Sequence, residues 1–107
     1  MLFNPHIGKI TIIISVKECE IRTPLANGAD LDSLMNEGKY RATTDAIAQS
    51  CHNSPTRMGF ILNVYDGNNS IVQQVIPFNG NFIYMRRYQK TSGTWRNWFV
   101  FTGTEVE

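Results

Sequence analysis

The feature that most constrains this chain is a series of short segments with apolar residues at every second position, separated by residues that favour tight turns. One such segment places Phe60, Leu62 and Val64 on the same side, and Asp66-Gly67-Asn68-Asn69 follows it. Successive side chains of an extended strand point to opposite faces, so this spacing predicts a half-buried strand. The turn residues predict a hairpin into a second strand, SIVQQVI.

The pattern continues through the last third of the sequence. Pro77 and Asn79-Gly80 interrupt it, and FIYMRRYQ then alternates again. A further turn at Thr91-Ser92-Gly93 leads into WRNWFVF. Several short strands with turn signals at regular spacing, and one short helix, predict a mostly β fold: a small antiparallel β domain.

The helix is expected just before this sheet. Asp30 can accept hydrogen bonds from the free amides of a following turn, and Leu31 and Leu34 fall on one side of it. These features predict a helix over about 31–36 that covers one end of the sheet. Gly38 stands where a left-handed residue would end the helix, and KYRAT after it is expected to be the first strand of the main sheet.

Two other stretches complete the outline. Residues 9–17 alternate apolar and polar side chains and predict an N-terminal strand, and a connector at about 22–29 follows it. Residues 45–57 have no clean period and are predicted to be a long loop. We therefore expect a strand and connector over 1–29 and a β domain over 30–107. The apolar face of the N-terminal strand consists of Ile10, Ile12, Ile14 and Val16.

Composition excludes several classes of function. Ten basic residues stand against nine acidic ones, so no strong field gathers nucleic acid or anionic lipid. The longest apolar run, Ile12-Ile13-Ile14, is far shorter than the ~18 residues of a membrane-spanning helix. The N-terminus has no signal-peptide pattern, so synthesis in the cytoplasm is expected. With 42% hydrophobic and 18% charged residues, the chain is expected to fold.

The sequence lacks the motifs typical of catalytic and cofactor-binding sites. The sequence contains no phosphate-binding glycine loop, no nucleophile elbow and no paired acid and base in a recognisable arrangement. Asp30 is explained by helix capping and Asp32 by solvent exposure. The sequence therefore predicts no catalytic residue, no cofactor and no enzymatic activity.

A metal site is not expected either. His6, Cys19, Cys51 and His52 are the candidate ligands, but the adjacent Cys51 and His52 cannot easily both bind one tetrahedral zinc, and there is no C-x-x-C pair. Two cysteines in an unexported chain are expected to stay reduced.

An aromatic and basic cluster near the C-terminus is the best candidate for a binding surface. Trp95 and Trp98 are expected on opposite faces of one strand, so that one fills the core and the other covers an edge. The alternative is a surface that stacks on sugar rings, because aromatic faces pack on sugars and arginine supplies a fork of donors. The candidate glycan ligands are Tyr84, Arg86, Tyr88 and Trp98.

Several short motifs also follow one another in a defined order and spacing. The run LANGADLDSLMNEGKY, then Asn53-Ser54-Pro55, Gly59, Gln73-Gln74, Arg86 and the sequence WRNW resemble, in order and spacing, the knob domain of R-type pyocin and bacteriophage tail fibres. The resemblance covers about residues 30–103. It implies a small antiparallel β fold with a short helix, found in trimers that bind cell-surface carbohydrate or act as structural modules. The residues that would determine the fold are Asp30, Leu31, Leu34, Gly38, Tyr40 and Trp95.

The resemblance implies a non-enzymatic virion component, a tail fibre, baseplate or appendage protein whose knob attaches to the host surface or its glycans. Its expected partners are other virion proteins, two further copies of itself in a homotrimer, and bacterial cell-surface carbohydrate, with neither nucleic acid nor membrane. Two alternatives remain: a purely architectural capping or decorating virion protein, and a carbohydrate-binding module that accompanies a polysaccharide-degrading tailspike. The strand at 9–17 would attach the protein to a neighbouring virion protein, or pair within the domain or across a trimer.

Overall fold

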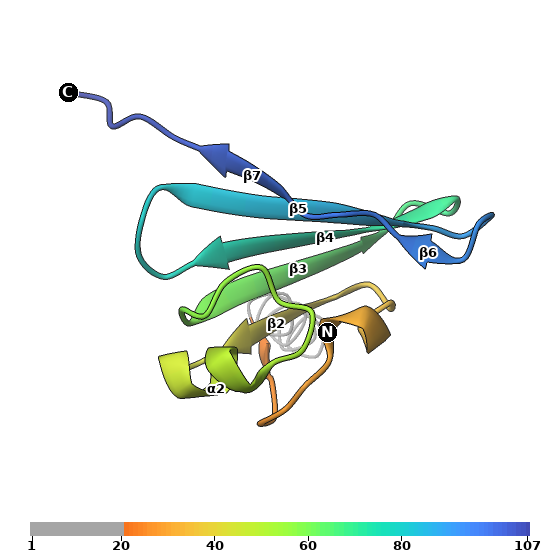
Figure 1. The fold of residues 1–107 in the computed structure, drawn as a ribbon, viewed down its shortest axis with the longest axis horizontal. Coiled ribbons are helices and arrows are strands. Elements are labelled where there is room, and N and C mark those ends of the chain that lie inside the picture. Colours follow the sequence, from red (N-terminus) through yellow and green to blue (C-terminus); the bar gives the residue numbers. More distant parts are fainter. Residues whose placement is uncertain (1–20) are drawn as a thin grey trace, which may run out of the picture.

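A single sheet dominates the computed structural model, which describes residues 21–107 (Figure 1). The predicted N-terminal strand with Ile10, Ile12, Ile14 and Val16 lies outside the described residues. The strands follow the order β1-β2-β3-β4-β5-β6, and β7 also pairs with β5. Only β1 runs parallel to its neighbour, so the predicted mostly antiparallel β fold is confirmed. The strands are β1 (Thr23–Pro24), β2 (Gly38–Ala42), β3 (Phe60–Asp66), β4 (Ser70–Pro77), β5 (Phe82–Gln89), β6 (Thr94–Trp95) and β7 (Phe99–Thr102).

The predicted turns join these strands. Between β3 and β4, Asn68 has a positive φ of 76°, and its amide donates to Asp66 Oδ1 at 3.0 Å. The amide of Gly67 donates to the carbonyl of Ser70 at 2.9 Å, which closes the hairpin. Gly80 and Gly93 have φ of 91° and 69°, so the turns that flank β5 use the conformational freedom of glycine.

One face of the sheet forms the core. Phe60, Leu62 and Val64 of β3 are at most 1% exposed, and Leu62 lies opposite Val75 of β4. The alternation predicted for β3 is therefore confirmed. Side chains from outside the main strands complete this core, namely Leu25, Leu31 and Ala48. Part of the predicted connector thus belongs to the domain, since Thr23–Pro24 pairs with β2 and Leu25 is 9% exposed.

The predicted helix over 31–36 is shorter and tighter than expected. It is a 3-10 turn, η1 (Leu31–Ser33), capped as predicted by Asp30, whose Oδ1 accepts from the amide of Asp32 at 2.9 Å. Leu34, with φ −91° and ψ 80°, leaves the helical region and ends the turn. The prediction for Gly38 was wrong: it begins β2 opposite Val64 instead of ending a helix.

The prediction of a loop over 45–57 was wrong in its first part, which forms the helix α2 (Asp45–Ser50). Thr44 caps it, because its Oγ1 accepts from the amide of Ile47 at 3.2 Å. Ala48 is 1% exposed and belongs to the core. The segment after α2 is irregular, and His52 joins it to η1 because its amide and carbonyl bond to Ala29 and Leu31.

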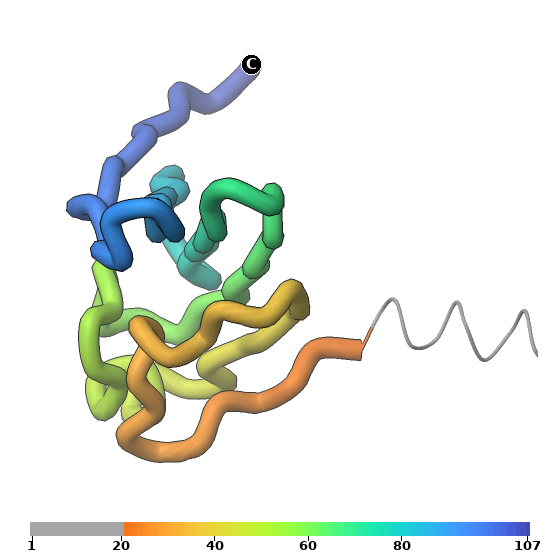
Figure 2. Tube along the Cα trace, turned by 90° about the vertical axis from the view of Figure 1, so that its right-hand side faces the viewer, coloured from red at the N-terminus to blue at the C-terminus, as the bar shows by residue number. Residues whose placement is uncertain are grey.

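The two ends of the described chain leave the domain differently. The segment at residue 21 enters on one side, whereas β7 and the residues after it project away from the rest of the chain (Figure 2). β7 pairs only with β5 among the described strands. All four residues of this C-terminal strand are exposed.

Candidate ligand-binding surface

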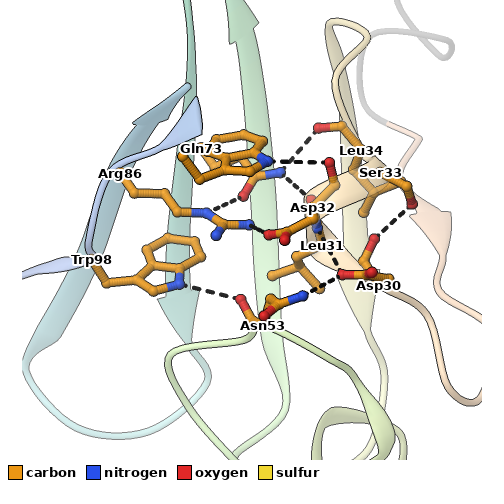
Figure 3. A network of polar contacts seen from close by, with 10 residues as sticks. Asp30, Leu31, Asp32, Ser33, Leu34, Asn53, Gln73, Arg86 and Trp98 are labelled. Atoms are coloured by element: carbon orange, nitrogen blue, oxygen red, sulfur yellow. Dashed lines mark hydrogen bonds and ion pairs between the residues drawn. The ribbon is translucent and has the colours of Figure 1, made fainter. Parts of the chain in front are cut away.

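Arg86 lies at the centre of the candidate surface, on the core face of β5 (Figure 3). It is 4% exposed and stands opposite Gln73 of β4, which is fully buried. Its Nε donates to Gln73 Oε1 at 2.9 Å, and its Nη2 lies 2.9 Å from Asp32 Oδ1. A buried charge is tolerated only when it is paired and hydrogen-bonded, and these two partners supply both contacts.

The amide of Gln73 connects this arginine to the 3-10 turn. Its Nε2 donates to the carbonyl of Leu31 at 2.7 Å and to the carbonyl of Leu34 at 3.0 Å. The carbonyl of Leu31 also accepts from the amide of Leu34 within the turn, whereas the carbonyl of Leu34 lies past the end of the turn and takes its hydrogen bond from the glutamine. Gln73 therefore holds η1 against β4.

Both tryptophans stack on the same guanidinium. Arg86 Cζ lies 4.0 Å from the ring centroid of Trp95 and 4.5 Å from that of Trp98, within cation–π range. Trp95 Nε1 donates to the carbonyl of Asp32 and Trp98 Nε1 to that of Asn53, each at 3.2 Å. The prediction that the tryptophans occupy opposite faces of one strand was wrong, because β6 ends at Trp95 and β7 begins only after Trp98. The break lets both rings reach Arg86.

A second polar contact ties the segment after α2 to η1. Asn53 Nδ2 donates to Asp30 Oδ1 at 2.8 Å, and Asn53 has a positive φ of 61°. This hydrogen bond, together with the one from the Asp32 amide, lowers the pKa of Asp30 below its usual value. Burial lowers the pKa of Arg86, and the neighbouring Asp32 carboxylate opposes that shift. The network thus holds an anionic turn against a buried cation.

The structure places three of the predicted ligand residues on one face of β5, namely Tyr84, Arg86 and Tyr88, and stacks Trp98 on Arg86. Tyr84, Tyr88 and Trp98 are half-buried and pack at the margin of the core. The ring of Tyr88 lies 5.2 Å from that of Trp95. Arg86 is buried and contacts Gln73 and Asp32, so its guanidinium is not presented to a ligand.

The residues expected to determine the fold surround the same network. Leu31 is fully buried, while Leu34, Tyr40 and Trp95 pack against the core, and Asp30 caps η1. The structural role of Gln73 was missed. The signal for it is a glutamine at a core position of an alternating strand, between Ile71 and Val75.

Metal ligands and membrane-spanning helices are the remaining features to consider in residues 21–107. This part of the chain holds no group of three or more His, Cys, Asp or Glu side chains that could bind a metal. Of the candidate ligands, Cys51 is a free thiol whose pKa is raised by burial, and His52 is exposed. His6 and Cys19 lie outside the described residues. None of the described helices is long and apolar enough to cross a membrane.

Comparisons with known proteins place this fold. No family model and no curated protein matches the chain. An R2-type pyocin tail fibre structure matches with a TM-score of 0.69 and 28% identity, covering 76% of this chain and 32% of that one. The R1 pyocin fibre of P. aeruginosa matches with a TM-score of 0.69 and 27% identity, covering 76% and 21%. The chain thus spans a fifth to a third of these structures, and the sheet that carries the Arg86 network is a pyocin tail fibre-like domain.

Proposed function

We propose that this protein is a non-enzymatic component of a phage or pyocin-like tail, present as a homotrimer, whose domain attaches the particle to bacterial cell-surface carbohydrate. The observation that carries this proposal is the match to pyocin tail fibres at 28% identity and a TM-score of 0.69 over 76% of the chain. The protein would act in the virion, in contact with other tail proteins.

The aromatic surface supports the carbohydrate part of the proposal. Tyr84, Tyr88 and Trp98 lie around Arg86, whose side chain fixes Trp98 by stacking at 4.5 Å. Rings that are fixed before binding lose little conformational entropy when a sugar packs on them. Arg86 is then a positioning residue, and the rings make the contact.

Binding to a bacterial glycan array tests the proposal. Tyr84→Ala and Tyr88→Ala should each weaken binding about two- to tenfold, which corresponds to the roughly 0.5–1.5 kcal/mol typical of an aromatic contact. Tyr65→Ala is the matched control, because Tyr65 is 49% exposed and belongs to the opposite face of the sheet. Binding to no glycan, or an equal loss in all three variants, would contradict the aromatic site.

A purely architectural role is the second candidate, favoured by the packing of Tyr84, Tyr88 and Trp98 against the core. In that case the predicted N-terminal strand attaches the protein to a neighbouring virion protein. Ile12→Asp with Ile14→Asp in the full chain should then abolish incorporation into particles, whereas Tyr88→Ala should leave host attachment unchanged. Normal incorporation of the Ile12 and Ile14 variant would contradict the attachment strand.

A further inference from the structure

The first half of β5 and the whole of β7 form a two-stranded ribbon at the edge of the sheet, residues 82–85 and 99–102. The ribbon is antiparallel, with Ile83 opposite Phe101 and Tyr84 opposite Val100. It lies at the end of the sheet from which the C-terminal residues project (Figure 1).

Both faces of the ribbon are apolar and exposed. On the face that continues the core, Phe82 is 37% and Val100 56% exposed. On the opposite face, Ile83, Phe99 and Phe101 are 37%, 56% and 55% exposed. A sheet in a monomer normally covers at least one of its faces, whereas the described residues cover neither face here.

The outer edge of the ribbon is equally unprotected. β7 pairs only with β5 among the described strands, so its other side presents unpaired backbone groups. Natural edge strands usually carry charged residues or proline that prevent pairing with other chains. Residues 82–85 and 99–104 contain no Asp, Glu, Lys, Arg or Pro.

The exposed area is large for a small domain. A buried aromatic side chain covers roughly 200 Å², so the exposed parts of Phe82, Phe99 and Phe101 alone amount to about 300 Å². With Ile83, Val100 and the strand backbone, two such ribbons together approach the order of 1,000 Å² that a specific interface buries. Such a patch on a soluble chain marks a contact with another protein.

A groove lies beside the ribbon, and the ribbon residues Ile83 and Phe101 form part of its lining. On the open face of the sheet, Ile61 lies opposite Ile76, and the groove of about 420 Å³ includes Ile76, Ile83 and Phe101. Glu105 is the one charged residue that lines this groove, so an uncharged ribbon edge meets mostly apolar and neutral groups there, and the net charge of the whole chain is only +1. The ribbon of one copy can therefore pack against the groove of another copy of the same chain, without a different partner protein.

We propose that the β5–β7 ribbon is the surface through which copies of this chain associate. This inference rests on the homotrimer of the proposed function and assigns its contact. In a trimer each copy has two neighbours, so that one covers Phe99 and Phe101 on the open face of the ribbon and the other covers Val100 on the face that continues the core.

Val100→Asp in the full chain tests this assignment, with Val106→Asp as the matched control. The two variants make the same substitution at an exposed valine, but Val106 is 97% exposed and lies beyond the ribbon. Light scattering of the wild type should give three times the chain mass, and Val106→Asp should not change it. Val100→Asp should give the mass of one chain.

A second variant and a measurement of folding distinguish loss of association from loss of folding. Phe101→Asp changes a residue of the opposite ribbon face and should also yield the monomer. Fluorescence of Trp95 and Trp98 should still show a cooperative unfolding transition in every variant, because the hydrogen bond, ion pair and ring contacts of Arg86 involve neither Val100 nor Phe101. A monomeric wild type, or an oligomer that survives in both ribbon variants, overturns the proposal.

Glycan binding measured on the same samples separates the two proposals. A wild type that binds no glycan but dissociates on Val100→Asp supports the ribbon contact and contradicts host attachment. A wild type that binds glycan as a monomer supports attachment and overturns the ribbon contact.

Discussion

The two halves of β5 differ in composition, apolar in residues 82–85 and polar in 86–89, and their environments are the reverse of what those compositions predict. In the second half, Arg86 is 4% exposed although it is charged, whereas in the first half Phe82 and Ile83 are each 37% exposed although they are apolar. The difference lies in what crosses the strand: η1 and the tryptophans cover Arg86, and no described element covers the ribbon. Burial here depends on the covering segments and not on the polarity of the strand.

The two halves also differ in the kind of interaction that each uses. The covered half depends on directed contacts, because Gln73, Asp32 and both tryptophans have fixed positions around one guanidinium. The ribbon offers only apolar area and free backbone groups. We therefore expect substitutions near Arg86 to change the stability of one chain, and substitutions in the ribbon to change association.

The largest contrast should come from two phenylalanines. Phe60→Ala should lower the free energy of unfolding by about 3–5 kcal/mol, because Phe60 is fully buried and its loss leaves a cavity. Phe101→Ala, at 55% exposure, should cost less than about 1 kcal/mol within one chain. Urea unfolding, at protein concentrations where both variants are monomeric, measures the two free energies of unfolding. An equal loss of stability in the two variants would contradict the distinction between the covered core and the exposed ribbon.

Arg86→Met should cost about 3 kcal/mol. The methionine keeps much of the apolar stem but leaves Asp32 and Gln73 without the cation and removes both ring contacts. The Oδ1 of Asp32 that faces Arg86 is buried, but the side chain as a whole is 41% exposed and can turn toward water once the cation is gone, which keeps the loss at the lower end.

Arg87→Met is the matched control for this substitution. Arg87 is the next residue of β5, exposed on the opposite face, so its loss should change stability by less than about 0.5 kcal/mol. Urea unfolding followed by tryptophan fluorescence compares the two variants. Equal stability of both would remove Arg86 from the structural network.

Gln73→Leu should cost about 2 kcal/mol, because the carbonyl of Leu34 loses its side-chain donor and the buried Nε of Arg86 loses its acceptor. Gln74→Leu should cost less, since Gln74 is half-buried on the other face and makes one hydrogen bond, with Asn63. Thermal unfolding of both variants measures the difference. A larger loss for Gln74→Leu would indicate that the open face, not η1, limits stability.

The strands and turns of this fold could be predicted because their signals are local. The alternation around Leu62 and the turn at Asn68 depend only on neighbouring residues, and both were correct. The helix α2 was missed because six residues give too short a period. Its cap, Thr44 followed by Asp45, was the available signal.

The candidate surface was harder to predict because it depends on contacts between distant segments. Arg86 alternates with Tyr84 and Tyr88, and that pattern gives its face but not its covering. The ion pair with Asp32 joins residues 54 positions apart, and the break between β6 and β7 brings Trp98 to the side of Trp95. Such contacts leave no periodic trace in the sequence.

The smallest expected effect is on the pH dependence of stability, through the carboxylate of Asp30. The hydrogen bond from Asn53 and that from the Asp32 amide lower the pKa of Asp30, so the stability it contributes is present above its unfolded pKa and is lost as pH falls through the lower folded value. Asp30→Asn keeps a capping oxygen but cannot titrate, so urea midpoints measured from pH 6 to pH 3 should fall less steeply than in the wild type. The difference should be small because Asp30 is exposed and water screens its charge. Part of the slope should persist in the variant, since Lys90 and the Asn68 amide also lower the pKa of Asp66. Identical slopes for wild type and variant would mean that the hydrogen bonds from Asn53 and the Asp32 amide do not stabilise the ionised carboxylate of Asp30 in the folded state.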